Sequence, residues 1–319
     1  MKIAVICGGL SPEREVSLSS GKMVAEALKQ RGHEVALADL SDDIPIGDTF
    51  GNEFIPKPRN ELSGRKIGDG VIELCRAADA VFPALHGGIG EDGRFRAALD
   101  IFGIPCAGAG FLSCAIAMDK ALSKILIKNA GVSVPRGIAL NRGERLEKRA
   151  IKFPCVIKPN DGGSSVGVSF ADNVSELENA LETTFNVTTK AVIEEKLVGR
   201  ELTVGIVNGR ALPAIEIIPK VGFYDYNNKY TPGATDEICP AHLTDAEAAR
   251  LRRSALAAAR ALGTTALCRV DFILSGGIFY CLEVNALPGM TETSLLPIAA
   301  KTAGISFPEL CEEIIKTAF

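Results

Sequence analysis

The sequence lacks any apolar run that approaches the roughly 18–20 residues needed to span a bilayer, so we expect no membrane role. It also lacks a concentrated basic region, since the formal net charge is -4 and the most basic cluster is "RLRR" at 250–253. Without a basic surface, nucleic acid is not an expected partner. The N-terminal "MKIAVICGGL" has no small-residue cleavage site and is typical of a first β-strand, which predicts a cytoplasmic protein.

The cysteines show no C-x-x-C pair, and their number, nine, is odd. Zinc sites and disulfide frameworks use paired or regularly spaced cysteines, whereas these are scattered through apolar segments. We therefore expect buried, reduced thiols at Cys7, Cys75, Cys106, Cys114, Cys155, Cys239, Cys268, Cys281 and Cys311.

The first part of the chain alternates β-branched runs with segments of helical periodicity. Strands are expected over 2–9, 33–40 and 80–88, and their βαβ order predicts a parallel sheet. Residues 41–70 are rich in glycine, proline and charge, and we interpret them as a long surface excursion. No internal repeat interrupts the 319 residues, a length that suits two or three domains.

After residue 111 the pattern changes to helices and antiparallel pairs of strands. One helix is predicted over 112–131, and a second, "SELENALETTF", should be capped by Ser175. We expect "FPCVIKP" to pair with "VGVSF", and "AVIEEKL" to pair with "RELTVGIVNG" and "RALPAIEIIP".

Two hairpins, an alanine-rich helix and two closing helices complete the predicted fold. The Asn-Gly of "VNGR" favours a type I′ turn, and "SGG" joins the strands "TALCRVDFIL" and "GIFYCLEVNALPG". The alanine-rich helix covers 245–263. The predicted fold class is α/β followed by α+β.

The stretch "VIKPNDGGSSVGVS", residues 156–169, has the chemistry of a phosphate site. It is not a P-loop, because Lys158 precedes the glycines and a strand, rather than a helix, follows them. We interpret it as a lysine on a strand followed by a glycine-serine flap that closes over phosphates. Lys120 is a second lysine that could reach the same phosphates, although alone it would suit a solvated helix.

A dinucleotide-binding motif is suggested by "GIGEDG" at 88–93, but we reject it. The motif falls on a later strand, and position 112, where the acidic residue is expected, is leucine. His86 and two acids also crowd a place where pyrophosphate needs bare backbone.

Polar side chains alternate along two strands near the C-terminus. Arg269 and Asp271 share one strand face, and Glu283 and Asn285 share a face of the hairpin partner. Oxygen ligands without nearby histidine or thiolate suit Mg²⁺ with a nucleotide. The alternative is an exposed face of paired charges, but the flanking apolar residues predict a semi-buried sheet, where unpaired carboxylates are costly.

Seven ordered motifs resemble the D-alanine–D-alanine ligase family of the ATP-grasp superfamily. They are "GGLSPEREVSLSSG" (8–21), "ALHGGIGEDG" (84–93), "AMDK" (117–120), "KPNDGGSSVG" (158–167), "FYDYNNKY" (223–230), "RVD" (269–271) and "EVNALPGMTETSL" (283–295). The resemblance implies a Rossmann-like domain at 1–111, then a two-lobed ATP-grasp fold with a central lobe at 112–200 and a C-terminal lobe at 201–319.

The resemblance also implies a reaction: ATP converts one D-alanine to an acyl phosphate, which a second D-alanine attacks to give the dipeptide, ADP and phosphate. Glu15 would hold the first ammonium and His86 would lie near its carboxylate. Arg269 and the Gly289 N–H would face the oxyanion, with Ser294 and Leu295 at the second carboxylate. Ser164 and Tyr230 would hydrogen-bond Glu15.

For the nucleotide and metals, the resemblance implies a larger set of contacts. The expected ATP-binding residues are Lys120, Lys158, Ser164, Ser165, Glu194, Glu195, Leu197, Glu201 and Lys229. Asp271, Glu283 and Asn285 would hold two Mg²⁺ or Mn²⁺ ions. A homodimer is also expected.

Two positions depart from the family pattern: Glu195 replaces the lysine of some relatives, and Ala286 the threonine of many. Two other functions stay open from the sequence. One is a D-alanine–D-lactate or D-alanine–D-serine ligase, although Tyr230 favours the dipeptide-forming type. The other is a catalytically silent ATP-binding protein, which would be expected to have lost a metal ligand or Arg269.

Overall fold

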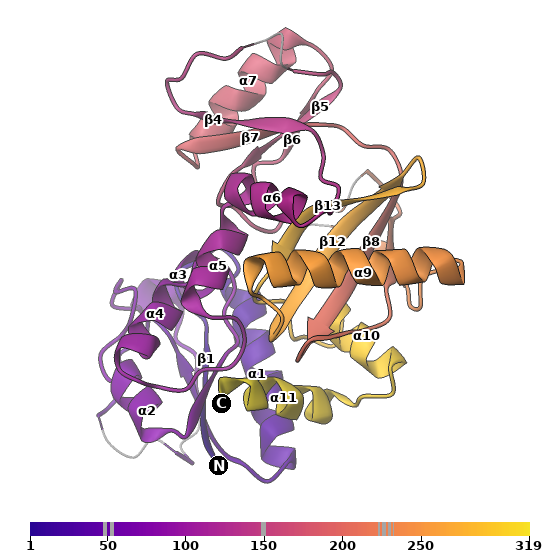
Figure 1. Ribbon diagram of the computed structural model, residues 1–319. Coiled ribbons are helices and arrows are strands. Elements are labelled where there is room, and N and C mark those ends of the chain that lie inside the picture. The colour runs from indigo at the N-terminus through magenta and orange to yellow at the C-terminus, as the bar shows by residue number, and fades with distance from the viewer. Residues whose placement is uncertain are drawn as a thin grey trace.

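The computed structural model describes residues 1–319 except 47–49, 52–53, 148–150, 223, 225–227, 229–230 and 232. Its described strands form three sheets (Figure 1). A four-stranded sheet lies under helix α7 (Val174–Phe185) at the top of the view, a three-stranded sheet lies at the lower left, and a six-stranded sheet lies on the right. None of the described helices is long and apolar enough to cross a membrane.

The N-terminal sheet is parallel, as predicted. Its strands are β1 (Lys2–Cys7), β2 (Glu34–Asp39) and β3 (Ala80–Pro83), in the order β2-β1-β3. Helices α1 (Arg14–Gln30), α2 (Val71–Ala77), α3 (Gly88–Glu91) and α4 (Arg94–Ile101) accompany them. Because β1 is buried on both faces, Val5 and Ile6 belong to different apolar cores.

The four-stranded sheet is antiparallel, with strand order β4-β7-β5-β6. Its elements are β4 (Gly137–Asn141), β5 (Cys155–Pro159), β6 (Ser169–Ala171), α7 (Val174–Phe185) and β7 (Lys190–Glu195). The cap prediction was wrong: Asn173, and not Ser175, accepts a hydrogen bond from the Glu176 N–H.

The six-stranded sheet follows in the order β11-β10-β8-β12-β13, with β9 paired to β8. Its strands are β8 (Arg200–Val207), β9 (Arg210–Ala211), β10 (Ile215–Pro219), β11 (Thr235–Ile238), β12 (Leu267–Ser275) and β13 (Ile278–Asn285). The predicted hairpin at Asn208 and Gly209 is confirmed, and both have positive φ, 48° and 73°.

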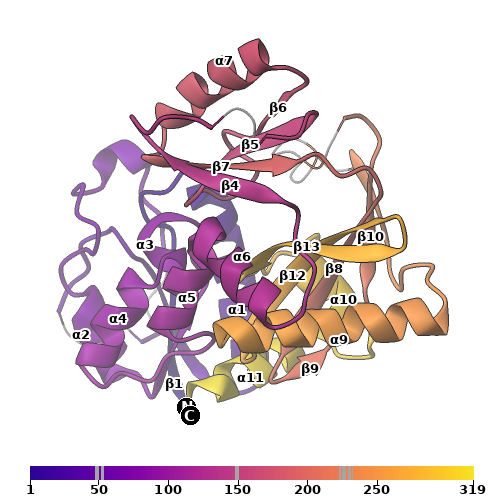
Figure 2. The same cartoon turned by 45° about the horizontal axis from the view of Figure 1, so that its top comes forward.

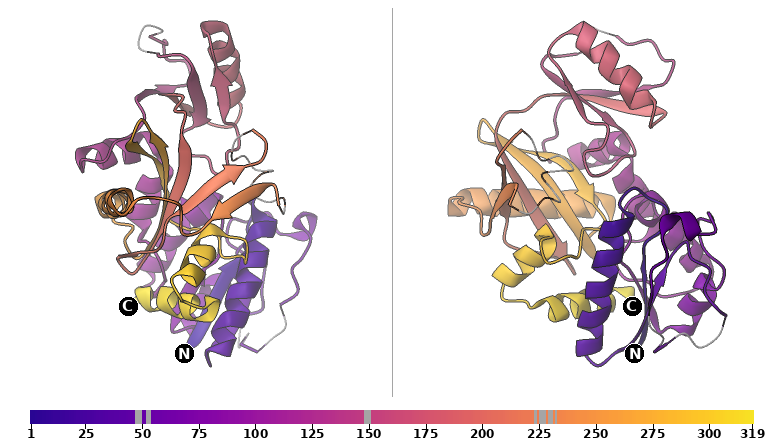
Figure 3. Two further views of the ribbon diagram at one scale, coloured as in Figure 1. Left: turned by 90° about the vertical axis from the view of Figure 1, so that its right-hand side faces the viewer. Right: turned by 180° about the vertical axis from the view of Figure 1, so that it is seen from behind.

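One pairing prediction was wrong, because β7 and β8 belong to different sheets. The chain leaves the four-stranded sheet after Glu195 and enters the six-stranded sheet at Arg200. In Figure 2 and in the left view of Figure 3, the four-stranded sheet lies above the six-stranded sheet.

The single helix expected at 112–131 is two helices, α5 (Phe111–Met118) and α6 (Lys120–Asn129). Asp119 breaks it, because its extended backbone lets its side chain accept a hydrogen bond from the Leu122 N–H and cap α6. The Lys120 N–H then donates to the Asn160 carbonyl, 3.0 Å away, so α6 begins at the base of the glycine-serine flap.

Helix α9 (Asp245–Leu262) confirms the alanine-rich prediction and packs on the six-stranded sheet. A capping box of Thr244 and Glu247 begins it, and Gly263 ends it at φ 71°. The closing helices α10 (Leu295–Thr302) and α11 (Phe307–Ile315) cover the space between this sheet and α1, as the view from behind in Figure 3 shows.

A β-bulge interrupts the pairing of β12 and β13. Asp271 pairs with Glu283, whereas the next residue, Phe272, pairs with Cys281, so Leu282 is the extra residue.

The described part of 41–70, which was predicted as a surface excursion, lies against the first sheet. It includes a short 3-10 helix, η1 (Arg59–Glu61). The Gly68 N–H donates to the Leu40 carbonyl, 2.8 Å away, and a Cβ on Gly68 would lie 1.9 Å from the Asp42 carbonyl oxygen. Glycine is therefore required at this close approach.

Candidate active site

Two adjoining cavities lie where the three sheets meet. The larger, about 620 Å³, opens between the four- and six-stranded sheets, and the smaller measures about 120 Å³. The larger volume suits a nucleotide-sized ligand. Six residues line both cavities: Lys120, Gly162, Gly163, Ser164, Tyr224 and Glu283.

The residues expected at ATP gather on the wall of the larger cavity. They are Lys120, Lys158, Ser164, Ser165, Glu194, Glu195, Leu197 and Glu201. Lys229 lies outside the described residues. The predicted grouping therefore holds for the described members of the set.

Beside this wall, two lysines share one buried glutamate. Lys158 Nζ lies 2.8 Å from Glu194 Oε2, and Lys124 pairs with Oε1 of the same side chain. Burial disfavours the carboxylate, but Lys158 and Lys124 outweigh it and lower the pKa of Glu194 to about 2. Burial and the charge of Lys158 lower the pKa of Lys124.

Sequence reasoning missed Lys124. Its signal was available, because Lys124 follows Lys120 by four residues and so shares a face of α6. The neighbouring Glu195 forms an ion pair with Arg136, whose Nη2 lies 3.2 Å from Glu195 Oε2.

The four polar residues of the C-terminal hairpin converge, as the strand alternation predicted. Arg269 pairs across the strands with Asn285, and Asp271 pairs with Glu283. Arg269 donates to both oxygens of Asp271, each at 2.9 Å. Burial disfavours the Arg269 charge, but Asp271 outweighs it and raises the pKa of Arg269.

Asp271 is buried, in agreement with the semi-buried sheet that the flanking apolar residues predicted. Thr203 Oγ1 donates to it at 2.6 Å, in addition to Arg269. Glu283 is 3.4 Å from Lys120 Nζ, and Asn285 accepts from the Leu287 N–H at 2.9 Å. The set offers two carboxylates and one amide oxygen, which are hard donors that fit Mg²⁺ or Mn²⁺. The described residues contain no group of three or more His, Cys, Asp or Glu arranged for a metal.

The smaller cavity contains most of the residues expected at the amino-acid substrates. His86, Arg269, Gly289, Ser294 and Leu295 line it, together with Asn285, which was expected at the metal. Gly289 approaches closely, since a Cβ there would lie 2.7 Å from Ser294 Oγ. Ser294 in turn accepts from the Thr291 N–H at 3.0 Å.

The structure corrects the prediction made for Glu15. This residue lies exposed on the first turn of α1, and Glu13 occupies the cavity wall instead. Ser164 Oγ accordingly donates to Glu13 Oε1, and not to Glu15. The physical reason is that Glu13 ends the loop before α1, where its carboxylate meets Ser164 of the flap, whereas Glu15 lies at an exposed position of the first helical turn.

Glu91, which sequence reasoning treated only as an obstacle to a dinucleotide, also lines the smaller cavity. Burial and the charge of Glu13 raise the pKa of Glu91 to about 8. His86 lies on the same wall, and burial together with Arg269 lowers the pKa of His86 to about 4. His86 is thus neutral near pH 7, with Ser20 Oγ 3.3 Å from Nε2.

The glycine-serine flap lines both cavities and is held at three points. Lys120 donates to the Gly162 carbonyl, Ser164 to Glu13, and Ser165 Oγ to the Tyr224 carbonyl at 2.9 Å. Ser164 and Ser165 have positive φ, 48° and 59°, which is unfavourable for residues with a Cβ. Their hydrogen bonds offset that strain. Tyr230, expected at this contact, lies outside the described residues.

Comparison with known proteins gives one family. The model described as D-ala D-ala ligase N-terminus matches residues 2–109, and the model of the C-terminus matches 126–316. The chain is 42% identical to a D-alanine–D-alanine ligase of Citrifermentans bemidjiense over 318 residues, 99% of this chain and 96% of the relative. It is 39% identical to the ligase of Syntrophotalea carbinolica over 317 residues, again 99% and 96%.

A solved structure gives the same result. The D-alanine–D-alanine ligase of Bacillus anthracis complexed with ATP superimposes with a TM-score of 0.82 at 34% identity, over 100% of this chain and 97% of the other.

Proposed function

The chain belongs to the D-alanine–D-alanine ligase family, and from that premise we propose how its two cavities divide the reaction. The enzyme uses ATP to join two D-alanines through a D-alanyl phosphate, for peptidoglycan precursor synthesis. One observation supports the division: Gly162, Gly163 and Ser164 line both cavities. ATP in the larger cavity would therefore meet D-alanine in the smaller one beneath one flap.

In the first step, a carboxylate oxygen of D-alanine attacks the γ-phosphorus of ATP, and the bond to ADP breaks. Lys120 and Lys158 would contact the phosphates and oppose their charge, with Lys229 as a further proposed contact. Asp271, Glu283 and Asn285 would hold two Mg²⁺ or Mn²⁺ ions. When bound, these ions neutralise phosphate charge.

Adenosine would lie deeper in the larger cavity. We assign the adenine to Glu194, Glu195 and the Leu197 backbone, and the ribose to Glu201. The pairing of Glu194 with two lysines gives it a second task, because it holds Lys158 beside the phosphates.

The first D-alanine would be oriented by charge. Glu13, in place of Glu15, would receive its ammonium, since a carboxylate faces the cavity there and accepts from Ser164. His86 would lie beside its carboxylate as a neutral hydrogen-bonding group, consistent with a pKa lowered to about 4 by burial and Arg269.

In the second step, the neutral amine of the second D-alanine attacks the acyl carbonyl carbon. The C–N bond forms, the C–O bond to phosphate breaks, phosphate leaves, and the amine proton passes to solvent or phosphate. Arg269 and the Gly289 N–H would stabilise the oxyanion, because both lie on this wall. Ser294 and Leu295 would hold the second carboxylate.

The flap would exclude water, which otherwise hydrolyses the acyl phosphate. Its bonds from Ser164 to Glu13 and from Ser165 to Tyr224 support this role. We retain Tyr230 as a further proposed contact of the flap.

Several broader features are proposals too. We propose a Rossmann-like domain at 1–111 and ATP-grasp lobes at 112–200 and 201–319, supported by one parallel and two antiparallel sheets. A cytoplasmic location is supported by nine free cysteines. A homodimer is supported by Ile101, Phe102, Phe111 and Leu112, which lie exposed on or beside α4 and α5. No nucleic acid or membrane partner is proposed.

Two matched variants test the substrate assignment. Glu13→Gln should lower kcat/KM for the first D-alanine by about 100-fold while leaving the KM for ATP near its normal value, since an ionic contact is lost. Glu15→Gln should behave like the unmodified enzyme. A damaging Glu15→Gln with a silent Glu13→Gln would reverse the assignment.

Substrate choice is tested by phosphate release with D-alanine, D-serine and D-lactate as second substrates. D-alanine should be used preferentially near neutral pH. Preference for D-lactate under those conditions would contradict dipeptide formation.

A further inference from the structure

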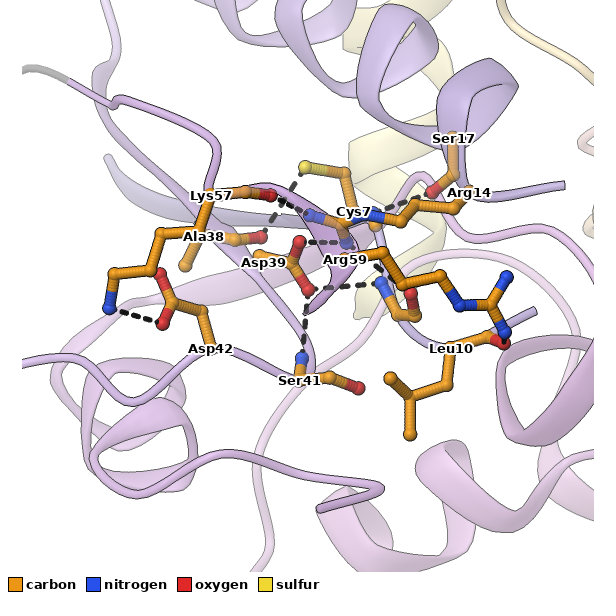
Figure 4. Close-up of polar contacts among 12 residues, drawn as sticks. Cys7, Leu10, Arg14, Ser17, Ala38, Asp39, Ser41, Asp42, Lys57 and Arg59 are labelled. Atoms are coloured by element: carbon orange, nitrogen blue, oxygen red, sulfur yellow. Dashed lines mark hydrogen bonds and ion pairs between the residues drawn. The ribbon is translucent and has the colours of Figure 1, made fainter. Parts of the chain in front are cut away.

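Arg14, the residue that follows Glu13, forms a buried ion pair with Asp39 (Figure 4). Neither Arg14 nor Asp39 lines either of the two cavities. Arg14, the first residue of α1, is 3% exposed, and Asp39, the last residue of β2, is 1% exposed. Removing such a pair from water is costly, so the fold retains it against a penalty. The other hydrogen bonds of Arg14 and Asp39 show which segments the pair connects.

Arg14 reaches three separate segments of the chain. It donates to Asp39, to the Gly9 carbonyl at 3.3 Å, and to the Lys57 carbonyl at 2.8 Å. Asp39 Oδ1 accepts from the Gly9 N–H at 3.0 Å and from the Ser41 N–H at 2.9 Å. One guanidinium therefore ties the loop after β1 to the end of β2 and to the 41–70 excursion.

There is little room for this loop to shift. A Cβ on Gly8, whose φ is 71°, would lie 2.3 Å from Asp39 Oδ2. Glycine is thus required for the loop to pass the carboxylate.

A second arginine grips the same loop from the excursion. Arg59, on η1, donates to the Leu10 carbonyl and, at 3.5 Å, to the Ser11 carbonyl. Ser11 Oγ accepts from the Glu13 N–H at 3.1 Å and donates to the His86 carbonyl at 2.5 Å. The backbone leading to Glu13 is consequently held on two sides, by one buried and one exposed arginine.

We propose that Arg14 and Arg59 are positioning residues, which use the 41–70 excursion to hold Glu13 in register with Ser164 of the flap and with the first D-alanine. The inference rests on the proposed role of Glu13 and extends it to a segment that carries no substrate contact. Neither arginine touches substrate; each acts through the loop at 9–13.

Three variants test this. Arg59→Ala removes an exposed side chain, so folding is not at risk. Arg14→Lys keeps the charge opposite Asp39 but cannot reach all three acceptors. Arg65→Ala is the matched control, because Arg65 is an exposed excursion arginine that pairs with Asp43 and Asp69 of the same segment.

The readout is the KM for each substrate, with kcat and the thermal midpoint measured alongside. Arg59→Ala and Arg14→Lys should raise the KM for the first D-alanine by about tenfold with little change in the KM for ATP, because small misplacements of a binding group are costly. Flap cleavage by protease within 160–167, in the presence of ATP, should also rise. Arg65→Ala should match the unmodified enzyme in every measurement.

Two outcomes would overturn the inference. One is an unchanged first KM in Arg59→Ala, and the other is an equal rise in both KM values, which marks general loss of structure. Glu13→Gln separates this from the proposed function. If Glu13→Gln impairs D-alanine use while Arg59→Ala does not, only the positioning inference fails; if Glu13→Gln is silent, the assignment of Glu13 itself fails.

Discussion

The larger and smaller cavities differ in how their charged groups are held. In the larger one, Lys124, Glu194 and Lys158 are already paired and sit on regular elements, α6, β7 and β5. In the smaller one, Glu13 and His86 come from loops of the first sheet, and Arg269 opposes them from the six-stranded sheet. The charged groups of the larger cavity are therefore held by one another, whereas those of the smaller cavity depend on how separate parts of the chain are placed.

The strongest test concerns Glu283, which belongs to both cavities. Glu283→Gln should lower turnover by about 10³-fold, because losing a metal-ligand charge removes several kcal/mol of transition-state stabilisation. The measurement is ATP-dependent phosphate release at saturating D-alanine and Mg²⁺. Glu292→Gln, at an exposed position outside both walls, is the control. Near-normal release by Glu283→Gln would refute the metal assignment.

The next effect is on stability and belongs to the smaller cavity alone. His86 has a pKa of about 4 in the folded protein against 6.5 when unfolded, owing to burial and Arg269. The unfolded chain therefore binds the proton more readily, and stability falls as the pH drops from 7 toward 4. At pH 5 the loss from this group is about 2 kcal/mol relative to pH 7.

His86→Gln should remove that part of the pH dependence, as measured by urea unfolding at pH 7 and pH 5. An unaltered difference between the two pH values would show that His86 does not titrate as its burial suggests.

A third test disturbs the paired charges of the larger cavity. With Lys124→Met, Glu194 is left to Lys158 alone, which would draw Lys158 away from the ATP phosphates that we propose it contacts. The KM for ATP should rise about tenfold, or about 1.4 kcal/mol, while the KM for D-alanine stays near normal. Lys128→Met, exposed one turn along α6, is the control. A selective rise in the D-alanine KM would contradict the division between the cavities.

The smallest effect concerns the flap that joins the two cavities. A Cβ on Gly163 would meet Glu13 Oε2 at 3.6 Å and Glu91 Oε2 at 3.8 Å, which are ordinary contacts. Gly163→Ala should therefore favour the described conformation by about 0.4–1 kcal/mol and slow protease cleavage within 160–167 about two- to fivefold. Gly167 has a φ of 75°, and a Cβ added there would lie 2.9 Å from Pro159. Gly167→Ala should therefore disfavour the described conformation and speed cleavage. Faster cleavage in Gly163→Ala would show that the flap does not close as described.

The same contrast explains what the sequence could predict. That Asp271 and Glu283 lie side by side could be predicted because strand alternation is local, and that Lys158 lies at a cavity could be predicted because its loop is distinctive. Glu13 ends the loop before α1 and Glu15 lies in its first turn, and the local sequence pattern does not decide which of the two faces inward. That choice depends on Glu13 meeting Ser164 of the flap, a partner far along the chain.

The misplaced elements have similar causes. The break between α5 and α6 depends on Asn160, which lies in a distant segment of the chain and accepts hydrogen bonds from the N–H groups of Lys120 and Ala121. The separation of β7 from β8 depends on which sheet each strand joins, which short-range periodicity does not determine.

The bulge at Leu282 has a consequence for how substitutions act on the larger cavity. In a regular strand, Leu282 and Glu283 would face opposite ways, yet both line the larger cavity. One residue thus supplies apolar surface and its neighbour a carboxylate, on the same side. Substitution of Leu282 would therefore change the apolar lining of the cavity without displacing the Glu283 carboxylate. Deleting the extra residue would instead shift the phase of the strand and separate the two properties at once.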